Sequence, residues 1–151
     1  MSAKGIYNYR EVNANLATAG IPSPEQLASL GSEGFEAVIN LLPADSEYAV
    51  KGEKEIVETQ GIDYRYIPVD FSAPAENDFV RFTSYMDEVK DKKVLLHCAA
   101  NYRVSAFYAL YAVQNKMWSE EQAQEFVSSV WNPDDYSAWP EFIARVKAST
   151  S

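Results

Sequence analysis

The spacing of apolar and polar positions separates strand segments from helical segments along the chain. Short apolar runs that are rich in β-branched or aromatic residues and bounded by glycine, proline or polar residues are typical of strands. Four such runs predict strands at residues 15–20, 35–42, 62–69 and 93–98. The last run is short and largely apolar, which favours an interior strand of a parallel sheet.

Helical periodicity and capping signals fill the intervals between these runs. Six helices are predicted, at residues 23–30, 46–61, 76–90, 104–117, 119–130 and 134–148. Two of them begin with a capping box, formed by Ser23 with Gln26 and by Ser119 with Gln122. The helix at 104–117 is apolar on nearly all sides, so we expect it to lie buried at the centre of the molecule.

Strands that alternate with helices indicate an α/β fold. We expect a mostly parallel central sheet of four to five strands, flanked by helices. The 151 residues fit a single domain, residues 1–151, with one hydrophobic core. In such a sheet ligands bind at the carboxyl ends of the strands, so functional residues are expected there.

The composition narrows the classes of partner and compartment. A formal net charge of −9 argues against nucleic acid and anionic membranes as partners, because both need a basic surface. No run reaches the roughly 18 apolar residues of a membrane span, and no leader peptide is visible. We therefore expect a cytoplasmic protein, or a periplasmic one if a leader has been removed. A single cysteine excludes an internal disulfide, and the chain carries no signal of oligomeric state.

Candidate chemistry is concentrated in "LLHCAANYRVSAF", residues 95–107. Cys98 ends a predicted strand and leads into a predicted helix, whose first N–H groups carry partial positive charge. Such a helix start stabilises a thiolate and binds anions. Ala99 and Ala100 are small enough to let the backbone approach a ligand, and Arg103 offers a planar fork of donors for two phosphate oxygens. The segment therefore predicts a nucleophile that faces an anion. The alternative is a small buried cysteine near a solvated arginine.

His97 is the only histidine in the chain and directly precedes Cys98. Neighbouring side chains of a strand point to opposite faces, so His97 does not serve as the base of a cysteine–histidine dyad. We expect it either to hydrogen-bond the turn backbone or simply to pack. One histidine and one cysteine do not make a transition-metal site, so neither metal nor cofactor is predicted. Asn101 can supply a left-handed turn residue, and Tyr102 can either wall the pocket or pack on the surface.

The stretch "VLLHCAANYRVSAF" resembles the phosphate-binding loop of the cysteine-dependent protein phosphatases. Together with "NLATAGIPSPEQLASLGSEGFEAVINLLP" and "YIPVDFSAPAEND", it is similar to a bacterial group of dual-specificity-phosphatase-like domains, relatives of which are fused to NAD kinases or metallo-β-lactamase-like domains. The resemblance covers residues 10 to 117. It implies a cysteine-phosphatase-like fold and hydrolysis of phosphomonoesters, with protein phosphotyrosine or phosphoserine, or a small phosphoester, as substrate.

The same resemblance implies roles for individual residues. Cys98 would form the thiophosphate, and Arg103 would hold the phosphoryl oxygens together with peptide N–H groups. Independently of the resemblance, the expected hydrogen bond from His97 to the turn backbone would support the loop. The substrate-binding residues would be Ala99, Ala100, Asn101, Tyr102, Val104 and Ser105. The ligand would be a phosphorylated substrate, or free phosphate or sulfate.

The loop departs from the phosphatase signature at the arginine. Four residues separate Cys98 from Arg103, where the signature has five, so Val104 stands at the arginine position while Ser105 stays in register. A shift of one residue at a helix start rotates a side chain by about 100°. Two alternatives follow: an anion-binding pseudophosphatase of weak or no activity, and a sulfurtransferase, because rhodanese-like loops resemble this shorter spacing.

A cysteine phosphatase also needs an acid for the leaving oxygen. The resemblance implies an aspartate on a loop before the cysteine, and Asp70 stands at the end of a predicted strand, 28 residues before Cys98. Its alternative role is to initiate a turn ahead of Ser72. Asp78 is a second candidate acid, although its place also suits the first turn of a helix. Asp45 and Glu47 would repel a highly charged phosphate at the pocket rim.

Overall fold

The computed structural model describes residues 3–150, with the side chain of residue 150 excepted. A five-stranded sheet forms the centre, in the order β1-β2-β5-β3-β4. β1 pairs antiparallel with β2, and the other neighbours are parallel. The strands are β1 (Arg10–Asn13), β2 (Leu16–Ala19), β3 (Ala37–Asn40), β4 (Asp63–Tyr66) and β5 (Val94–His97). The predicted fold class, a mostly parallel sheet flanked by helices, is confirmed.

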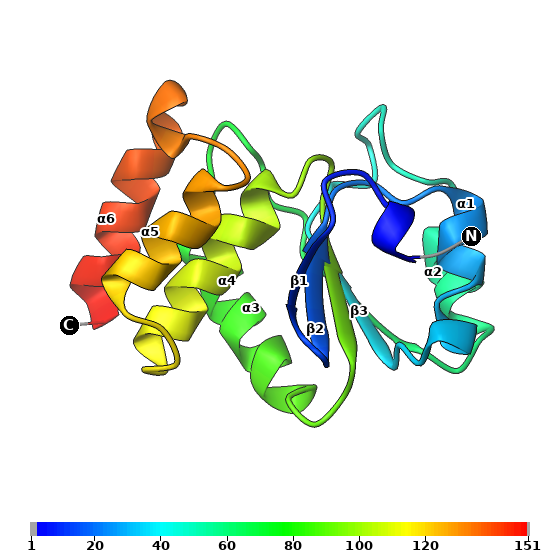
Figure 1. Ribbon diagram of the computed structural model, residues 1–151. Coiled ribbons are helices and arrows are strands. Elements are labelled where there is room, and N and C mark those ends of the chain that lie inside the picture. Colours follow the sequence, from blue (N-terminus) through cyan, green and yellow to red (C-terminus); the bar gives the residue numbers. More distant parts are fainter. Residues whose placement is uncertain (1–2, 151) are drawn as a thin grey trace.

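Helices cover both faces of the sheet (Figure 1). One face carries α1 (Pro24–Ala28) and α2 (Glu53–Glu58). The other face carries the longer helices α3 (Glu76–Glu88), α4 (Tyr102–Gln114), α5 (Glu120–Ser128) and α6 (Ala138–Thr150). Three short 3-10 helices lie at Ala3–Gly5, Gly31–Glu33 and Pro133–Asp135. Within residues 3–150, no helix combines the length and the apolar character needed to cross a membrane.

Each predicted strand and helix has a counterpart whose ends lie within three residues of the predicted ones, apart from two helices, and one strand was not predicted. The predicted helix at 46–61 is realised only as α2, because the chain enters it through Gly52 with a left-handed φ of 77°. The predicted helix at 134–148 is split into a 3-10 turn and α6. β1 was not predicted, since "REVN" is an edge strand without a buried apolar face. Both predicted capping boxes are present.

Each face of the sheet supports its own buried cluster. Beneath α1 and α2 the cluster includes Leu27, Val38 and Leu95, and beneath the other helices it includes Phe107 and Trp139. Nine residues of α4 are buried, so the prediction of a central buried helix is confirmed. The two clusters hold the parallel strands in register, so that their carboxyl ends form one edge of the sheet.

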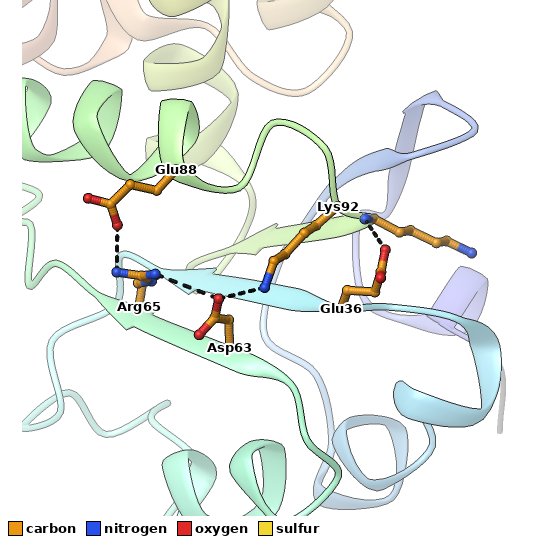
Figure 2. Close-up of polar contacts among 6 residues, drawn as sticks. Glu36, Asp63, Arg65, Glu88 and Lys92 are labelled. Carbon is orange, nitrogen blue, oxygen red and sulfur yellow. Dashed lines mark hydrogen bonds and ion pairs between the residues drawn. The ribbon is translucent and has the colours of Figure 1, made fainter.

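The two ends of the parallel strands differ in chemistry. At the amino ends, partly exposed charged residues tie β4 to neighbouring segments: Arg65 contacts Glu88 at 2.7 Å, and Lys92 contacts Asp63 at 2.8 Å (Figure 2). At the carboxyl ends, the loops after β3, β4 and β5 gather at the top of the view in Figure 1. Cys98 lies at this second end, directly after β5.

Candidate active site

The predicted nucleophile, Cys98, opens the connection between β5 and α4. Its peptide N–H donates to the carbonyl oxygen of Ala19 at 3.3 Å, which anchors the residue to the end of β2. Its side chain is only 1% exposed and belongs to the cluster beneath α3–α6. Cys98 therefore lies at the carboxyl edge of the sheet, where the sequence places it, with its sulfur buried.

The turn after Cys98 closes through a left-handed residue. Asn101 has a φ of 72° and directly precedes the first residue of α4. Residues other than glycine rarely adopt this region, although asparagine tolerates it. The prediction that Asn101 supplies a left-handed turn position is confirmed.

Peptide N–H groups at the start of α4 form a candidate anion cradle. The N–H of Ser105 donates to the carbonyl oxygen of Asn101 at 3.0 Å, which begins the pairing of the helix. The N–H groups before it have no intrahelical partner, and a helix start attracts negative charge. In the part of the chain that the structure describes, six of them make no hydrogen bond to a protein acceptor: those of Ala99, Ala100, Asn101, Tyr102, Arg103 and Val104.

Arg103 extends from the first turn of α4 toward the loop after β4. Its Nη1 donates to the carbonyl oxygen of Val69 at 3.3 Å, and its guanidinium lies over the ring of Phe71 at 5.4 Å. Burial lowers the pKa of Arg103, whereas the negative charges of Cys98 and Asp70 raise it. Burial has the larger effect, so the pKa of Arg103 is lowered overall, and the predicted nucleophile and the predicted acid both act on the guanidinium electrostatically.

Asp70 is exposed in the loop after β4 and takes part in a turn. Its Oδ1 accepts a hydrogen bond from the N–H of Ser72 at 2.9 Å, and its carbonyl oxygen accepts one from Ala73 at 3.1 Å. Asp70 nevertheless lines an open pocket of about 750 Å³ together with Arg103. Asp78 lies in α3 and is not among the residues that line this pocket.

The remaining walls of the pocket come from the loops after β3 and β4. The N–H of Ala44 donates to the hydroxyl of Tyr66 at 2.7 Å, which ties the loop after β3 to the end of β4. Asp45 lines the pocket, so an acidic side chain does stand at the rim. Leu41 is fully buried and Leu42 is 1% exposed, so the end of β3 offers no cation to an anion.

His97 points to the opposite face of the sheet from Cys98, as predicted. Its Nδ1 lies 3.3 Å from the carbonyl oxygen of Cys98, and its Nε2 lies 2.5 Å from Oε2 of Glu53 on α2. Burial, and then the Glu53 carboxylate, raise the pKa of Tyr64, whose hydroxyl also accepts a hydrogen bond from Asn40 at 3.0 Å. A buried polar cluster on the α2 face of the sheet thus contacts the loop through the carbonyl oxygen of Cys98.

The other predicted binding residues divide between the cradle and the core. The side chain of Val104 is fully buried, so Val104 can contribute to the site only through its peptide N–H. The hydroxyl of Ser105 donates to the carbonyl oxygen of Tyr102 at 3.0 Å and accepts from Nε1 of Trp131 at 3.1 Å. With its N–H also paired, Ser105 is not brought into the cradle. The Tyr102 ring stacks on Trp131 at 4.7 Å, so the packing role of that ring is the one observed.

Sequence reasoning missed three residues that surround the loop: Phe71, Glu53 and Asn8. Phe71 follows the predicted acid and underlies Arg103. Glu53 reads as a solvated helix residue, yet it is 5% exposed. The side chain of Asn8 reaches the loop from the N-terminal segment, donating to the carbonyl oxygen of Ala100 at 2.9 Å. No local pattern identifies such contacts, because each joins segments far apart in the chain. Within residues 3–150, no group of three His, Cys, Asp or Glu residues could hold a metal ion.

No protein-family model matches the chain, whereas solved structures do. Two crystal structures of DUF442 proteins from Shewanella putrefaciens CN-32, each named as a candidate phosphatase, are similar over nearly its whole length. One is 36% identical with a TM-score of 0.85, covering 97% of this chain and 92% of that one. The other is 34% identical with a TM-score of 0.89, covering 98% and 96%.

More distant structures share the fold alone. Tk-PTP in its active form is 19% identical with a TM-score of 0.76, covering 93% of this chain and 97% of that one. P. aeruginosa TpbA in complex with phosphotyrosine is 13% identical with a TM-score of 0.71, covering 95% and 90%. The architecture is therefore that of phosphatases of the tyrosine and dual-specificity type.

Longer proteins of known name are also similar to this chain over part of their length. A beta-lactamase hydrolase-like protein of Agrobacterium fabrum is 32% identical over 102 residues, which is 66% of this chain. A protein of the same name from Xylella fastidiosa is 27% identical over 106 residues, or 68% of this chain. The chain spans only about a quarter of these relatives, 23% and 24% of their lengths.

Proposed function

This chain belongs to the DUF442 family of cysteine-phosphatase-like proteins, and from that premise we propose that it hydrolyses phosphomonoesters through a thiophosphate on Cys98. The observation that carries the proposal is the loop itself. Open N–H groups at the start of α4 adjoin a cysteine, and the nearby Arg103 shares a pocket with Asp70. These features together support phosphoryl transfer to sulfur at this edge of the sheet.

The proposed reaction has two steps. The phosphoryl oxygens bind the loop N–H groups and Arg103, and the Cys98 thiolate attacks phosphorus. The bond from phosphorus to the ester oxygen breaks, and Asp70 gives its proton to that oxygen. The Asp70 carboxylate then removes a proton from water, which attacks the thiophosphate and releases phosphate and the thiolate.

The natural substrate is proposed only as a class. TpbA and SIW14, two proteins with this fold, have been solved with phosphotyrosine and citrate bound, which supports a phosphorylated or similarly anionic ligand. The net charge of −9 and Asp45 at the pocket rim disfavour substrates that carry many phosphates. We therefore expect a singly phosphorylated protein side chain or a small phosphoester.

A second function is favoured by the burial of Cys98, whose side chain is 1% exposed. A loop that binds phosphate or sulfate without exposing the sulfur would be a pseudophosphatase. No observation on this fold favours the sulfurtransferase alternative, which thiosulfate and cyanide would test.

The decisive experiment is hydrolysis of p-nitrophenyl phosphate by the wild type and by Cys98→Ser. We expect turnover by the wild type and its complete loss in the variant, because serine is not a thiolate. Asp70→Asn should slow the reaction about 10²- to 10⁴-fold, which is the usual contribution of a general acid. The matched control Asp78→Asn should leave the rate unchanged.

The outcomes separate the two functions. Activity that survives Cys98→Ser would eliminate the thiophosphate mechanism. Phosphate binding by a wild type that shows neither turnover nor a burst of p-nitrophenol would establish the pseudophosphatase instead.

A further inference from the structure

The N-terminal segment before β1 is bonded directly to the candidate anion loop. The side chain of Asn8 donates to the carbonyl oxygen of Ala100 at 2.9 Å, and that of Asn101 donates back to the carbonyl oxygen of Asn8 at 2.9 Å. Alongside, the N–H of Ile21 donates to the carbonyl oxygen of Ala99 at 2.8 Å. We call these two bonds, from Asn8 to Ala100 and from Asn101 to Asn8, the asparagine clasp.

Both asparagines hold the left-handed backbone that the clasp requires. Asn8 has a φ of 55° and Asn101 a φ of 72°. The amide of Asn101 is fully buried, and its Nδ2 also donates to Oγ1 of Thr18 at 2.9 Å. Its Oδ1 has no partner among the described residues, so the side chain is oriented through Nδ2 alone.

The clasp holds one peptide plane of the loop, and the hydrogen bond from Ile21 holds the plane before it. A trans peptide holds its carbonyl oxygen and the following N–H in opposite directions. Because the oxygens of Ala99 and Ala100 are both bound by the N-terminal part of the chain, the N–H groups of Ala100 and Asn101 are fixed as well. A left-handed residue next to a helical one also makes the concave array of N–H groups that binds anions.

We propose that Asn8 and Asn101 are positioning residues, which preorganise the loop N–H groups for a tetrahedral anion. The proposal rests on the proposed function, in which these N–H groups hold the phosphoryl oxygens. It assigns to the segment before β1 a part in binding, although none of its residues belongs to the loop. The clasp takes the place of the glycines that a phosphate-binding turn usually contains.

The close approach at Gly20 shows how tightly the loop is held. A Cβ added there would lie 2.7 Å from the carbonyl oxygen of Ala99 and 2.8 Å from Cδ2 of Tyr7. The N–H of Gly20 also donates to the carbonyl oxygen of Tyr7 at 2.8 Å. The N-terminal segment, the end of β2 and the loop are therefore packed as one unit, and loosening one member should loosen the others.

The test uses alkylation of Cys98 by iodoacetamide, which reports a single site because the chain has one cysteine. Inorganic phosphate is the probe ligand. Asn8→Gly keeps the left-handed backbone but removes the clasp donor. Its matched control is Lys116→Gly, because Lys116 also has a positive φ, 59°, and lies beyond α4.

We expect phosphate to slow alkylation of the wild type. In Asn8→Gly, alkylation without phosphate should be about tenfold faster, the equivalent of one lost hydrogen bond, and half-protection should need about tenfold more phosphate. Lys116→Gly should match the wild type in both quantities. Equal behaviour of Asn8→Gly and Lys116→Gly in both would overturn the clasp proposal, even in an active phosphatase.

Asn101→Gly provides a second, independent variant. It preserves the backbone conformation and removes both bonds of the buried amide, so we expect the same two changes in a protein whose circular dichroism is unaltered. Full phosphate protection in this variant would show that the left-handed backbone alone suffices, and would contradict the proposal. Failure of phosphate to protect the wild type would instead count against the proposed function. The alkylation rates of Cys98 without phosphate would still test the clasp in that case.

Discussion

The displaced arginine is the residue on which the chemistry of this site depends most. Arg103 stands one position earlier than the phosphatase signature requires, yet its guanidinium reaches the carbonyl oxygen of Val69 and lies over Phe71. The shift of one residue rotates the direction in which the Arg103 side chain leaves the helix. The side chain is long enough to compensate, because several bonds separate its guanidinium from the backbone. Burial lowers the pKa of Arg103, and the charges of Cys98 and Asp70 act on the same guanidinium in the opposite direction.

We therefore expect Arg103→Lys to be damaging although it keeps the charge. Lysine cannot offer the planar fork that binds two phosphoryl oxygens, and the loss of one charge-assisted hydrogen bond corresponds to about 1.5–3 kcal/mol. The value of kcat/KM for p-nitrophenyl phosphate should fall roughly 10- to 100-fold.

Arg81→Lys, an exposed substitution on α3, is the matched control and should retain the wild-type rate. Unchanged kcat/KM in Arg103→Lys would mean that the guanidinium does not hold the substrate.

At the scale of elements, the loop before β5 is joined to β4 by the ion pair between Lys92 and Asp63, at the amino end of the sheet (Figure 2). The hydrogen bond from Lys92, 2.8 Å long, is the main cause that lowers the pKa of Asp63. Both side chains are partly exposed, at 40% and 39%, so solvent screening limits what the pair contributes. The contact between Lys92 and Asp63 joins β4 to the α3–β5 loop at the surface, outside the hydrophobic core.

The pair makes a small, pH-dependent contribution to stability. Lys92→Met should lower the free energy of unfolding by about 0.5 kcal/mol near neutral pH. Because the folded pKa of Asp63 is lowered from 3.8, this contribution is present above that value and is lost as the pH falls through the folded pKa. Urea unfolding at several pH values measures it.

Lys90→Met, in the same region of the chain, serves as the control and should show no such difference. A deficit in Lys92→Met that stays constant down to pH 2 would rule out Asp63 as its source.

On the scale of the whole molecule, the last helix supports the loop that carries the predicted acid. Nε1 of Trp139 on α6 donates to the carbonyl oxygen of Phe71 at 2.9 Å, and the two rings lie 5.6 Å apart. Trp139 is fully buried and also packs against Phe107 of α4. The C-terminal helix therefore connects the core to the residue beneath Arg103.

Trp139→Phe tests this connection. The change keeps an aromatic ring but leaves a carbonyl oxygen without its donor, so the free energy of unfolding should fall by about 1–3 kcal/mol. Trp118→Phe, at a partly buried tryptophan that packs on Tyr108, should cost less. Equal losses in urea unfolding would indicate that ring volume, and not the hydrogen bond, explains the effect.

Local patterns were sufficient to predict most of the fold. The parallel strands, the central helix and both capping boxes depend on residues within a few positions of one another, so periodicity and capping chemistry reveal them. The same holds for Cys98 at a strand end and for Asn101 as a left-handed turn residue. The strand β1 and the short extent of α2 were not predicted, because an edge strand and a broken helix lack a strong periodic signal.

The arrangement of the site was decided by contacts between distant segments. Asn8 and Asn101 are 93 positions apart, and His97 and Glu53 are 44 apart. Residues so separated meet only after the sheet and helices have packed, and nothing in either local segment encodes the partner. The chain alone thus locates a cysteine at an anion-binding turn, whereas tertiary packing sets the direction of the N–H groups and guanidinium around it.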